Sequence, residues 1–326
     1  MRKTLTTAIF AAGLSALGFV QAHAATEIRY AIWANQGEAQ YEGALEFKRV
    51  VEEGADGRYT VSVYGGDQLG TPRELFTQLA LGVTQISASG DPGIKEIEYL
   101  AIPYLMKGIK NYGAVLDTDF GQEWNQKLID EREIRLIGFM PRNPRQISAD
   151  IEINSIDDLK GLKLRSPERD YYVKSLSALG ANPTPMAFAE VYTGLQAGVV
   201  DGQENPIETI YAGKFYEVQK SIAMVNYIKK PAYVMISDAF WQELSPEDQA
   251  LLKKANDASN AVIAQKLPVQ TEKMIAEMKA AGIVFTHPDT KPFIEATQSV
   301  RDELGTKMWG EEVYKKVSEI GQKDFD

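Results

Sequence analysis

Arg165 is the residue of this sequence best placed to bind an anion. In "GLKLRSPERDYY" it ends an alternating run typical of a β-strand, and Ser166 and Pro167 then begin a helix as N-cap and first residue. The carboxyl end of a strand beside a helix N-terminus is where open α/β sheets bind ligands. A guanidinium there suits a planar carboxylate. The alternative is a salt bridge to Glu168 or Asp170.

Arg145 is the second candidate, in the segment "PRNPRQIS". This segment follows a predicted strand at 132–140, and Pro141 and Pro144 indicate a stiff loop. Arg145 is predicted either to assist in binding an anion or to be a surface charge. Arg142 is expected to be a surface charge.

The stretch "VYTGLQAGVVDGQENP" (191–206) changes from helical spacing to a β-branched strand at Gly198. It delivers Asn205, an amide that can both donate and accept, to the end of that strand. Asp201 and Glu204 could be read as a general acid and base. Their spacing places them on opposite faces of a strand, which argues against a catalytic pair. Asp201 is expected to bind backbone amides instead.

Further polar candidates share a position just after strand ends in the first half of the chain: Trp33, Asn35, Gln36, Ser89 and Asp91. Phe188 is a candidate for an apolar wall. Because most of these side chains form hydrogen bonds, they favour a hydroxylated C4–C6 acid such as a sugar acid.

The N-terminus has the features of a secretory signal peptide. Arg2 and Lys3 precede an apolar run at 5–20, and an A-x-A pattern follows, so cleavage is expected after Ala24. A membrane anchor is the alternative, but the run is shorter than the ~20 residues of a span. The expected location is the periplasm.

Composition excludes several classes of protein. With 35 basic and 45 acidic residues, the formal charge is −10, which argues against nucleic acid or anionic lipid as a partner. Cysteine is absent, and His287 is the only histidine after cleavage. A Ser-His-Asp triad or a His-rich zinc site is therefore not expected, and no cofactor or enzymatic activity is predicted.

Helix and strand signals alternate along the chain, which predicts an α/β protein with largely parallel sheets. About 300 mature residues favour two lobes. "LFTQLALGVTQI" (75–86) aligns without gaps with residues 191–202. This is either chance similarity or one building block present in both lobes, which would then face each other across a cleft. From Ser245 a long helical stretch follows, expected to be kinked or interrupted at Pro268.

Several motifs together resemble one family. "LKLRSPERDYY", "LGANPTPM", "EVYTGLQ", "GVVDGQENP" and "KFYEVQK", with "GDQLGTPRELF" and "IPYLM" earlier, are similar to the DctP-type solute-binding proteins of tripartite ATP-independent periplasmic (TRAP) transporters. The resemblance implies a two-lobed, type II-like periplasmic-binding-protein fold. Each lobe would hold a mixed, mostly parallel sheet flanked by helices, and hinge strands and a long spanning helix would join the lobes.

The resemblance also implies roles. Arg165 would clamp the ligand carboxylate, Arg145 would assist, and Asn205 and Phe188 would complete that wall. The partners would be a small organic acid and the TRAP membrane subunits, with the protein itself a monomer. The expected division begins with a signal peptide at 1–24. The first lobe comprises 25–142 plus about 232–267. The second lobe, with the C-terminal helices, comprises about 143–231 plus 268–326. Two alternatives are an exported enzyme acting on acidic sugars and a sensor module that presents its ligand to a receptor kinase.

Overall fold

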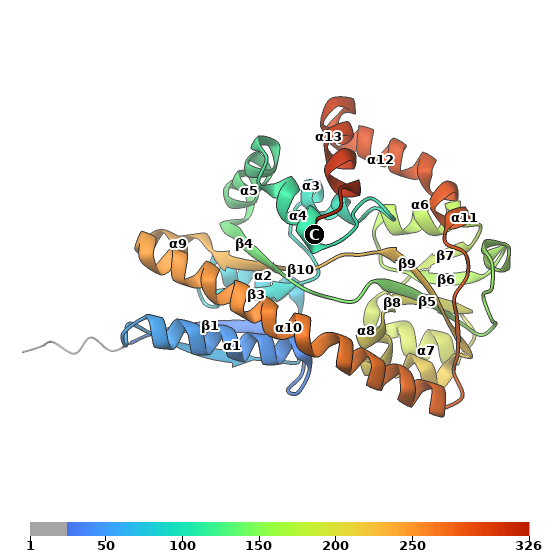
Figure 1. The fold of residues 1–326 in the computed structure, drawn as a ribbon, viewed down its shortest axis with the longest axis horizontal. Helices are drawn as coiled ribbons and strands as arrows, with labels where there is room; N and C mark the ends of the chain where they lie inside the picture. Colours follow the sequence, from blue (N-terminus) through green and yellow to red (C-terminus); the bar gives the residue numbers. More distant parts are fainter. Residues whose placement is uncertain (1–24, 326) are drawn as a thin grey trace, which may run out of the picture.

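The computed structural model describes residues 25–325, so the predicted signal peptide lies outside the described residues. Two β-sheets lie side by side, each flanked by helices (Figure 1). The long helix α10 (Pro246–Ala280) runs along both of them. The predicted fold class, two α/β lobes with a long spanning helix, is confirmed.

The strands are β1 (Thr26–Ile32), β2 (Tyr59–Tyr64), β3 (Ile86–Ser89), β4 (Ile134–Met140), β5 (Arg145–Ala149), β6 (Lys163–Ser166), β7 (Asn182–Pro185), β8 (Gly202–Pro206), β9 (Ser221–Ile228), β10 (Ala232–Ser237) and β11 (Val284–Thr286). The α-helices besides α10 are α1 (Ala39–Gly54), α2 (Pro72–Ala80), α3 (Lys95–Glu98), α4 (Ile109–Leu116), α5 (Asp119–Arg132), α6 (Asp170–Ala178), α7 (Val191–Gln196), α8 (Ile207–Ala212), α9 (Asp238–Glu243), α11 (Lys291–Ala296), α12 (Gln298–Trp309) and α13 (Glu311–Gln322). Short 3-10 helices are η1 (Tyr99–Ala101), η2 (Ile156–Leu159), η3 (Phe188–Glu190) and η4 (Phe215–Val218).

The two sheets have the same strand arrangement. The first has the order β2-β1-β3-β10-β4 and the second β7-β6-β8-β5-β9, with β11 added at the edge. In each sheet the first three strands are parallel, and the fourth strand pairs antiparallel with both neighbours. The carboxyl ends of β3, β6 and β8 are therefore available for a site between the lobes.

The similarity between residues 75–86 and 191–202 corresponds to matching structure. Gly82 and Gly198 follow α2 and α7 with φ of 65° and 67°. The amide of Val83 donates to Gln78 O at 2.8 Å, and that of Val199 donates to Gly194 O at 2.9 Å. The same helix end leads into β3 in one lobe and β8 in the other, which supports one building block in both lobes.

Two short segments carry the chain between the sheets. Residues 141–144 join β4 to β5, and residues 229–231 join β9 to β10. Each segment leads into a strand, β5 or β10, that pairs antiparallel with its neighbours in the sheet that the chain enters. The lobes are thus joined by extended strands, with α10 as a third connection.

Of the two alternatives expected at Pro268, a kink or an interruption, the interruption is wrong, because helix α10 continues through Pro268. Pro268 is exposed, whereas its neighbour Leu267 is buried. Pro268 has no N–H to donate to the carbonyl of Ala264, but Ala264 is also exposed, so water can bond to that carbonyl and offset the lost hydrogen bond. Close packing against α1 also holds the helix in place. A Cβ atom added at Gly43 of α1 would lie only 2.6 Å from the Ile263 side chain of α10, so the two helices touch at this glycine.

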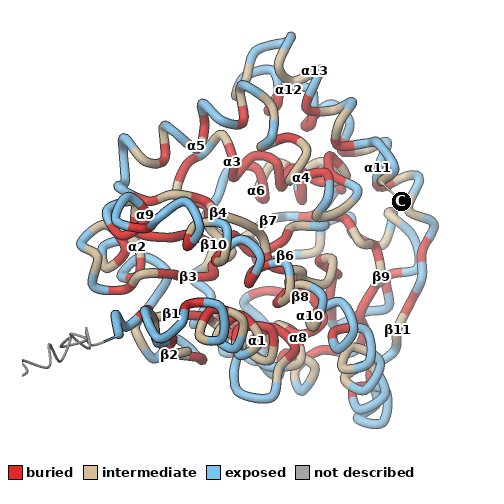
Figure 2. Tube along the Cα trace, turned by 60° about the vertical axis from the view of Figure 1, so that its left-hand side comes forward, coloured by how far each residue is buried: buried red, intermediate tan, exposed pale blue. Residues whose placement is uncertain are grey.

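Buried residues follow the strands and the inner faces of the helices (Figure 2). One cluster under α1 and α10 includes Tyr30 and Phe47. Another extends across both lobes, from Tyr233 in β10 to Tyr227 in β9 and Phe293 in α11. The C-terminal helices therefore pack over both lobes, with α13 against α4 and α12 against α6.

Candidate ligand-binding site

A cavity of about 380 Å³ lies between the lobes, where β3, β6 and β8 end. Its walls come from both lobes and from the second chain crossing. It is lined by Pro72, Ser89, Gly90, Asp91, Glu98, Arg145, Arg165, Pro167, Arg169, Tyr171, Tyr172, Phe188, Asn205 and Lys230. An outer recess of about 840 Å³ shares Arg165, Arg169 and Phe188 with this cavity and reaches further toward α2. We call the inner space the interlobe cavity.

Arg165 is buried in the wall of the interlobe cavity, with 3% of its surface exposed. β6 holds it between Thr184 of β7 and Gln203 of β8. Its Nε and Nη2 donate to Met186 O at 3.0 and 2.8 Å, and its guanidinium lies 6.0 Å from the ring centre of Phe188. These contacts fix the plane of the guanidinium without cancelling its charge.

No ion pair of Arg165 is present among the described residues; neither Glu168 nor Asp170 contacts it. The Asp170 carboxylate instead accepts the Tyr99 hydroxyl at 2.7 Å. Burial lowers the pKa of Arg165 from its usual value; the nearby Glu204 carboxylate opposes this shift, and the charge of Arg145 adds to it. Burying a cation without a carboxylate partner is unfavourable, and an anion that binds beside it supplies the missing counter-charge.

Arg145 is equally buried, but its charge is already paired. It does not lie in a loop as expected: it is the first residue of β5 and pairs with Pro206 of β8. Its guanidinium donates to both carboxylate oxygens of the fully buried Glu204, with Nη2 2.7 Å from Oε1. Burial alone would lower the pKa of Arg145, but the Glu204 carboxylate raises it well above its usual value.

Asn205 is oriented by the same network. Its Oδ1 accepts from Arg145 Nη2 at 2.9 Å, and its Nδ2 donates to Gln203 Oε1 at 2.6 Å. Glu204, which with Asp201 could be read as an acid–base pair, is therefore the partner of Arg145. Asp201 accepts the backbone amide of Lys163 at 2.8 Å, as its expected role at the turn requires.

The first-lobe candidates divide into two groups. Ser89 and Asp91 line the interlobe cavity, and Ser89 Oγ accepts from the Asp91 amide at 3.2 Å. Trp33, Asn35 and Gln36 are not among the lining residues. The chain turns outward after β1, so Asn35 and Gln36 are exposed, and Asn35 donates to Glu38 at 3.0 Å.

Trp33 lies under Arg142, 4.9 Å from ring centre to guanidinium. The expectation that Arg142 is a surface charge is wrong. Its guanidinium is largely buried, donates to Thr209 Oγ1 at 3.0 Å and lies 3.5 Å from Glu208 Oε1. Because residues 141–144 cross between the lobes, Arg142 lies between Trp33, just after β1, and α8.

Three charged residues of the interlobe cavity did not emerge from the sequence: Glu98, Arg169 and Lys230. Arg169 contacts Asp91 through Nη2, and its Nε lies 3.0 Å from Glu98 Oε1, so it joins the second lobe to the first. Lys230 lies beside Pro231 at a chain crossing. The sequence signal for Lys230 was a pair of lysines, Lys229 and Lys230, beside the expected lobe boundary at about 231–232. Glu98 lies in helix α3, and the sequence contained no signal for it.

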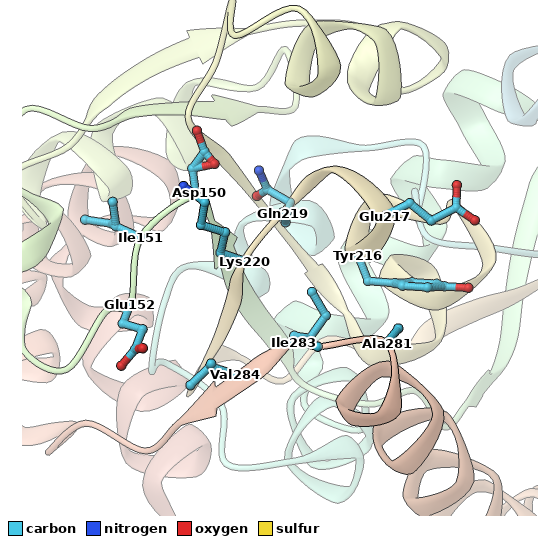
Figure 3. Close-up of a pocket in the computed structure, with 11 residues that line it drawn as sticks. Asp150, Ile151, Glu152, Tyr216, Glu217, Gln219, Lys220, Ala281, Ile283 and Val284 are labelled. Atoms are coloured by element: carbon cyan, nitrogen blue, oxygen red, sulfur yellow. The ribbon is translucent and has the colours of Figure 1, made fainter.

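A second recess, of about 680 Å³, lies on the outside of the second lobe (Figure 3). Its rim holds the carboxylates Asp150, Glu152 and Glu217, and among residues 25–325 Lys220 is the single cation lining it. No arginine from that part of the chain lines it, and the acidic side chains would repel a carboxylate. The interlobe cavity is therefore the candidate site for an organic acid.

The structure around the cavity can be compared with known proteins. A model of the bacterial extracellular solute-binding proteins, family 7 (DctP), matches residues 30–307. The sialic acid-binding periplasmic protein SiaP of Vibrio cholerae is 34% identical over 300 residues, which cover 91% of this chain and 93% of that protein. The chain belongs to this family.

Other family members resemble it over similar lengths. The 2,3-diketo-L-gulonate-binding periplasmic protein YiaO of Escherichia coli is 30% identical over 309 residues, covering 92% of this chain and 93% of that protein. A TRAP periplasmic solute binding protein from Roseobacter denitrificans, solved with bound L-galactonate, has a TM-score of 0.76 and 29% identity, covering 90% of this chain and 98% of that one.

Membership identifies the chain as a TRAP solute-binding protein rather than an enzyme, so the exported-enzyme alternative is not supported. Family members are periplasmic and work with TRAP membrane subunits. In the part of the chain that the structure describes, no helix is long and apolar enough to cross a membrane.

Proposed function

We propose that this protein captures a small hydroxylated organic acid, such as a sugar acid, in the interlobe cavity. Arg165 binds the ligand carboxylate, Asn205 and the Arg145–Glu204 pair form the polar wall beside it, and Phe188 covers the apolar side. Ser89 and Asp91 bind hydroxyl groups from the first lobe. The observation that carries the proposal is the buried guanidinium of Arg165, which has no carboxylate partner among the described residues.

The comparisons favour the hydroxylated class of ligand. Similar proteins are described as binding sialic acid and 2,3-diketo-L-gulonate, and one was solved with L-galactonate. Each of these ligands is an acid with several oxygen-bearing carbons. A cavity that combines one free guanidinium with amide, hydroxyl and carboxylate side chains suits such a molecule.

The remaining features of the proposal follow from the sequence. The mature protein begins at Ala25 in the periplasm and acts as a monomer, with a first lobe of 25–142 plus about 232–267. The second lobe comprises about 143–231 plus 268–326. The protein delivers its ligand to TRAP membrane subunits. Trp33, Asn35 and Gln36 are not included in the site, because they lie outside the cavity lining.

Substitution of Arg165 tests the proposal. A thermal-shift screen of organic acids first finds an acid that stabilises the protein. Titration calorimetry with that acid should then show a loss of ~2–5 kcal/mol for Arg165→Ala, roughly 30- to 4,000-fold in affinity, because a desolvated charge pair loses one partner. Arg165→Lys should also bind poorly, since an ammonium cannot form two parallel bonds.

Arg49→Ala is the matched control. Arg49 pairs with Glu46 and Glu53 on the exposed face of α1, away from the cavity. Its removal should leave both stability and affinity nearly unaltered, because exposed ion pairs contribute little. Near-wild-type affinity in a folded Arg165→Ala protein would contradict the proposed role of Arg165.

A further inference from the structure

The charges around the interlobe cavity nearly cancel. Four cations line it: Arg145, Arg165, Arg169 and Lys230. Three carboxylates oppose them, namely Asp91 and Glu98 in the lining and the buried Glu204 bonded to Arg145. One positive charge remains, and water is largely excluded from most of these groups.

The two lobes contribute this charge unequally. On the side of the second lobe, Glu204 cancels Arg145, and Arg165 has no carboxylate partner among the described residues. On the side of the first lobe, the single Arg169 serves both Asp91 and Glu98. The second-lobe wall of the cavity is therefore cationic because of Arg165. The facing wall holds two carboxylates, Asp91 and Glu98, and the single charge of Arg169 can neutralise only one of them.

Glu98 is the more deeply buried of these two carboxylates. Its side chain is 10% exposed, whereas that of Asp91 is 27% exposed and better screened by water. No ammonium group in the described part of the chain lies within ion-pair distance of Glu98. The charges of Lys230 and Arg169 both stabilise the Glu98 carboxylate, although the Lys230 ammonium forms no ion pair with it and lies 5.7 Å from the ring centre of Tyr233. Burial nevertheless raises the pKa of the Glu98 carboxyl, because it outweighs these two charges.

Resting on the proposed function, we propose that the interlobe cavity selects acids with a single negative charge, and that Glu98 is the residue that excludes a second carboxylate. A monoanion on Arg165 brings the charge of the cavity to zero. The uncharged end of the same ligand, with its hydroxyl groups, donates hydrogen bonds to Asp91 and Glu98. A dianion instead places its second carboxylate against these side chains, and like charges in a desolvated site repel strongly.

The test uses pairs of acids that differ only in one terminal group. Gluconate and glucarate, galactonate and galactarate, and D-erythronate and meso-tartrate have matching hydroxyl stereochemistry, and each second member has a carboxylate in place of a terminal CH₂OH. Calorimetry at fixed pH and ionic strength gives the affinity ratio within each pair. For the wild-type protein, we expect the monoacid to bind at least about tenfold more tightly than its diacid.

Glu98→Gln keeps the size of the side chain and removes its charge. It should lower the ratio by about fivefold or more, chiefly because the diacid binds more tightly. Glu168→Gln is the control, since Glu168 is exposed, lines only the outer recess and changes the net charge equally. It should leave the ratio unchanged. Melting temperatures confirm that both variants fold.

Several results would overturn the inference. A diacid that binds the wild-type protein as tightly as its monoacid overturns the single-charge selection. A ratio that does not move in folded Glu98→Gln overturns the role of Glu98. If no monocarboxylate in a broad panel binds at all, the proposed function itself is wrong, and this inference with it.

Discussion

At the scale of single residues, the Glu204 carboxylate gives the buried arginines Arg145 and Arg165 different roles. Arg145 and Arg165 are both almost fully buried, but Glu204 pairs only with Arg145. The sequence predicted both arginines as candidates, because each follows or ends a strand. It could not predict the Glu204 pair, because that contact depends on the antiparallel pairing of β5 with β8 and no strand was expected at β5.

Glu204→Gln should destabilise the protein strongly. The substitution keeps the shape of the side chain but leaves the Arg145 guanidinium buried without a counter-charge, which costs about 3–5 kcal/mol. Urea unfolding followed by circular dichroism measures the change. Glu312→Gln, which removes an exposed i,i+4 partner of Lys316, should leave stability nearly unchanged. A Glu204→Gln protein as stable as the control variant would show that Arg145 does not depend on this pair.

At the scale of elements, the helix–Gly–strand units were predictable and several strands were not. Gly82 and Gly198 marked their helix ends in the sequence, because each ends a helical pattern before β-branched residues. β7 contains Pro183 and Pro185, which argued against a strand. It is nevertheless possible because β7 lies at the edge of its sheet, where a proline need not donate to a neighbour.

Alanine at Gly82 or Gly198 should cost stability without altering ligand affinity. Both glycines have left-handed φ, which costs other residues about 1–2 kcal/mol. An added Cβ would meet nothing within 4 Å at Gly198 and only Ser237 Oγ at 3.8 Å at Gly82, so the backbone alone determines the effect. Both positions precede their strands, at the ends away from the interlobe cavity. Denaturant unfolding and calorimetry measure the two quantities.

Gly113→Ala is the matched control for these substitutions. Gly113 lies within helix α4, and a Cβ there would also meet nothing within 4 Å. Because its backbone is helical, alanine should be neutral or stabilise the protein by roughly 0.5–1 kcal/mol. If Gly82→Ala and Gly198→Ala behaved like Gly113→Ala, the left-handed conformation at the two helix ends would be refuted.

At the scale of the whole molecule, the two lobes share a hydrophobic cluster, and around the cavity they also meet through polar contacts. At its mouth, Arg169 contacts Asp91 and Glu98, and Tyr99 donates to Asp170. Half of the Arg169 side chain is exposed, and exposed ion pairs contribute only about 0.2–1 kcal/mol. These contacts are too weak to keep the mouth of the cavity closed by themselves, so a ligand that binds both lobes should shift the population toward the closed form.

The ligand should therefore reduce the radius of gyration measured by small-angle X-ray scattering. The two chain crossings at 141–144 and 229–231 are the segments where rotation of the lobes is expected, since hinges lie at the ends of elements. Arg169→Gln removes the contact at the mouth but leaves Arg165 intact, so the ligand should still compact the variant, with affinity reduced by no more than about tenfold. Lys316→Gln, whose partner Glu312 lies in the same helix, should change neither quantity. A scattering profile unchanged by saturating ligand in the wild-type protein would contradict closure, because a ligand held by both lobes must favour the state in which they meet.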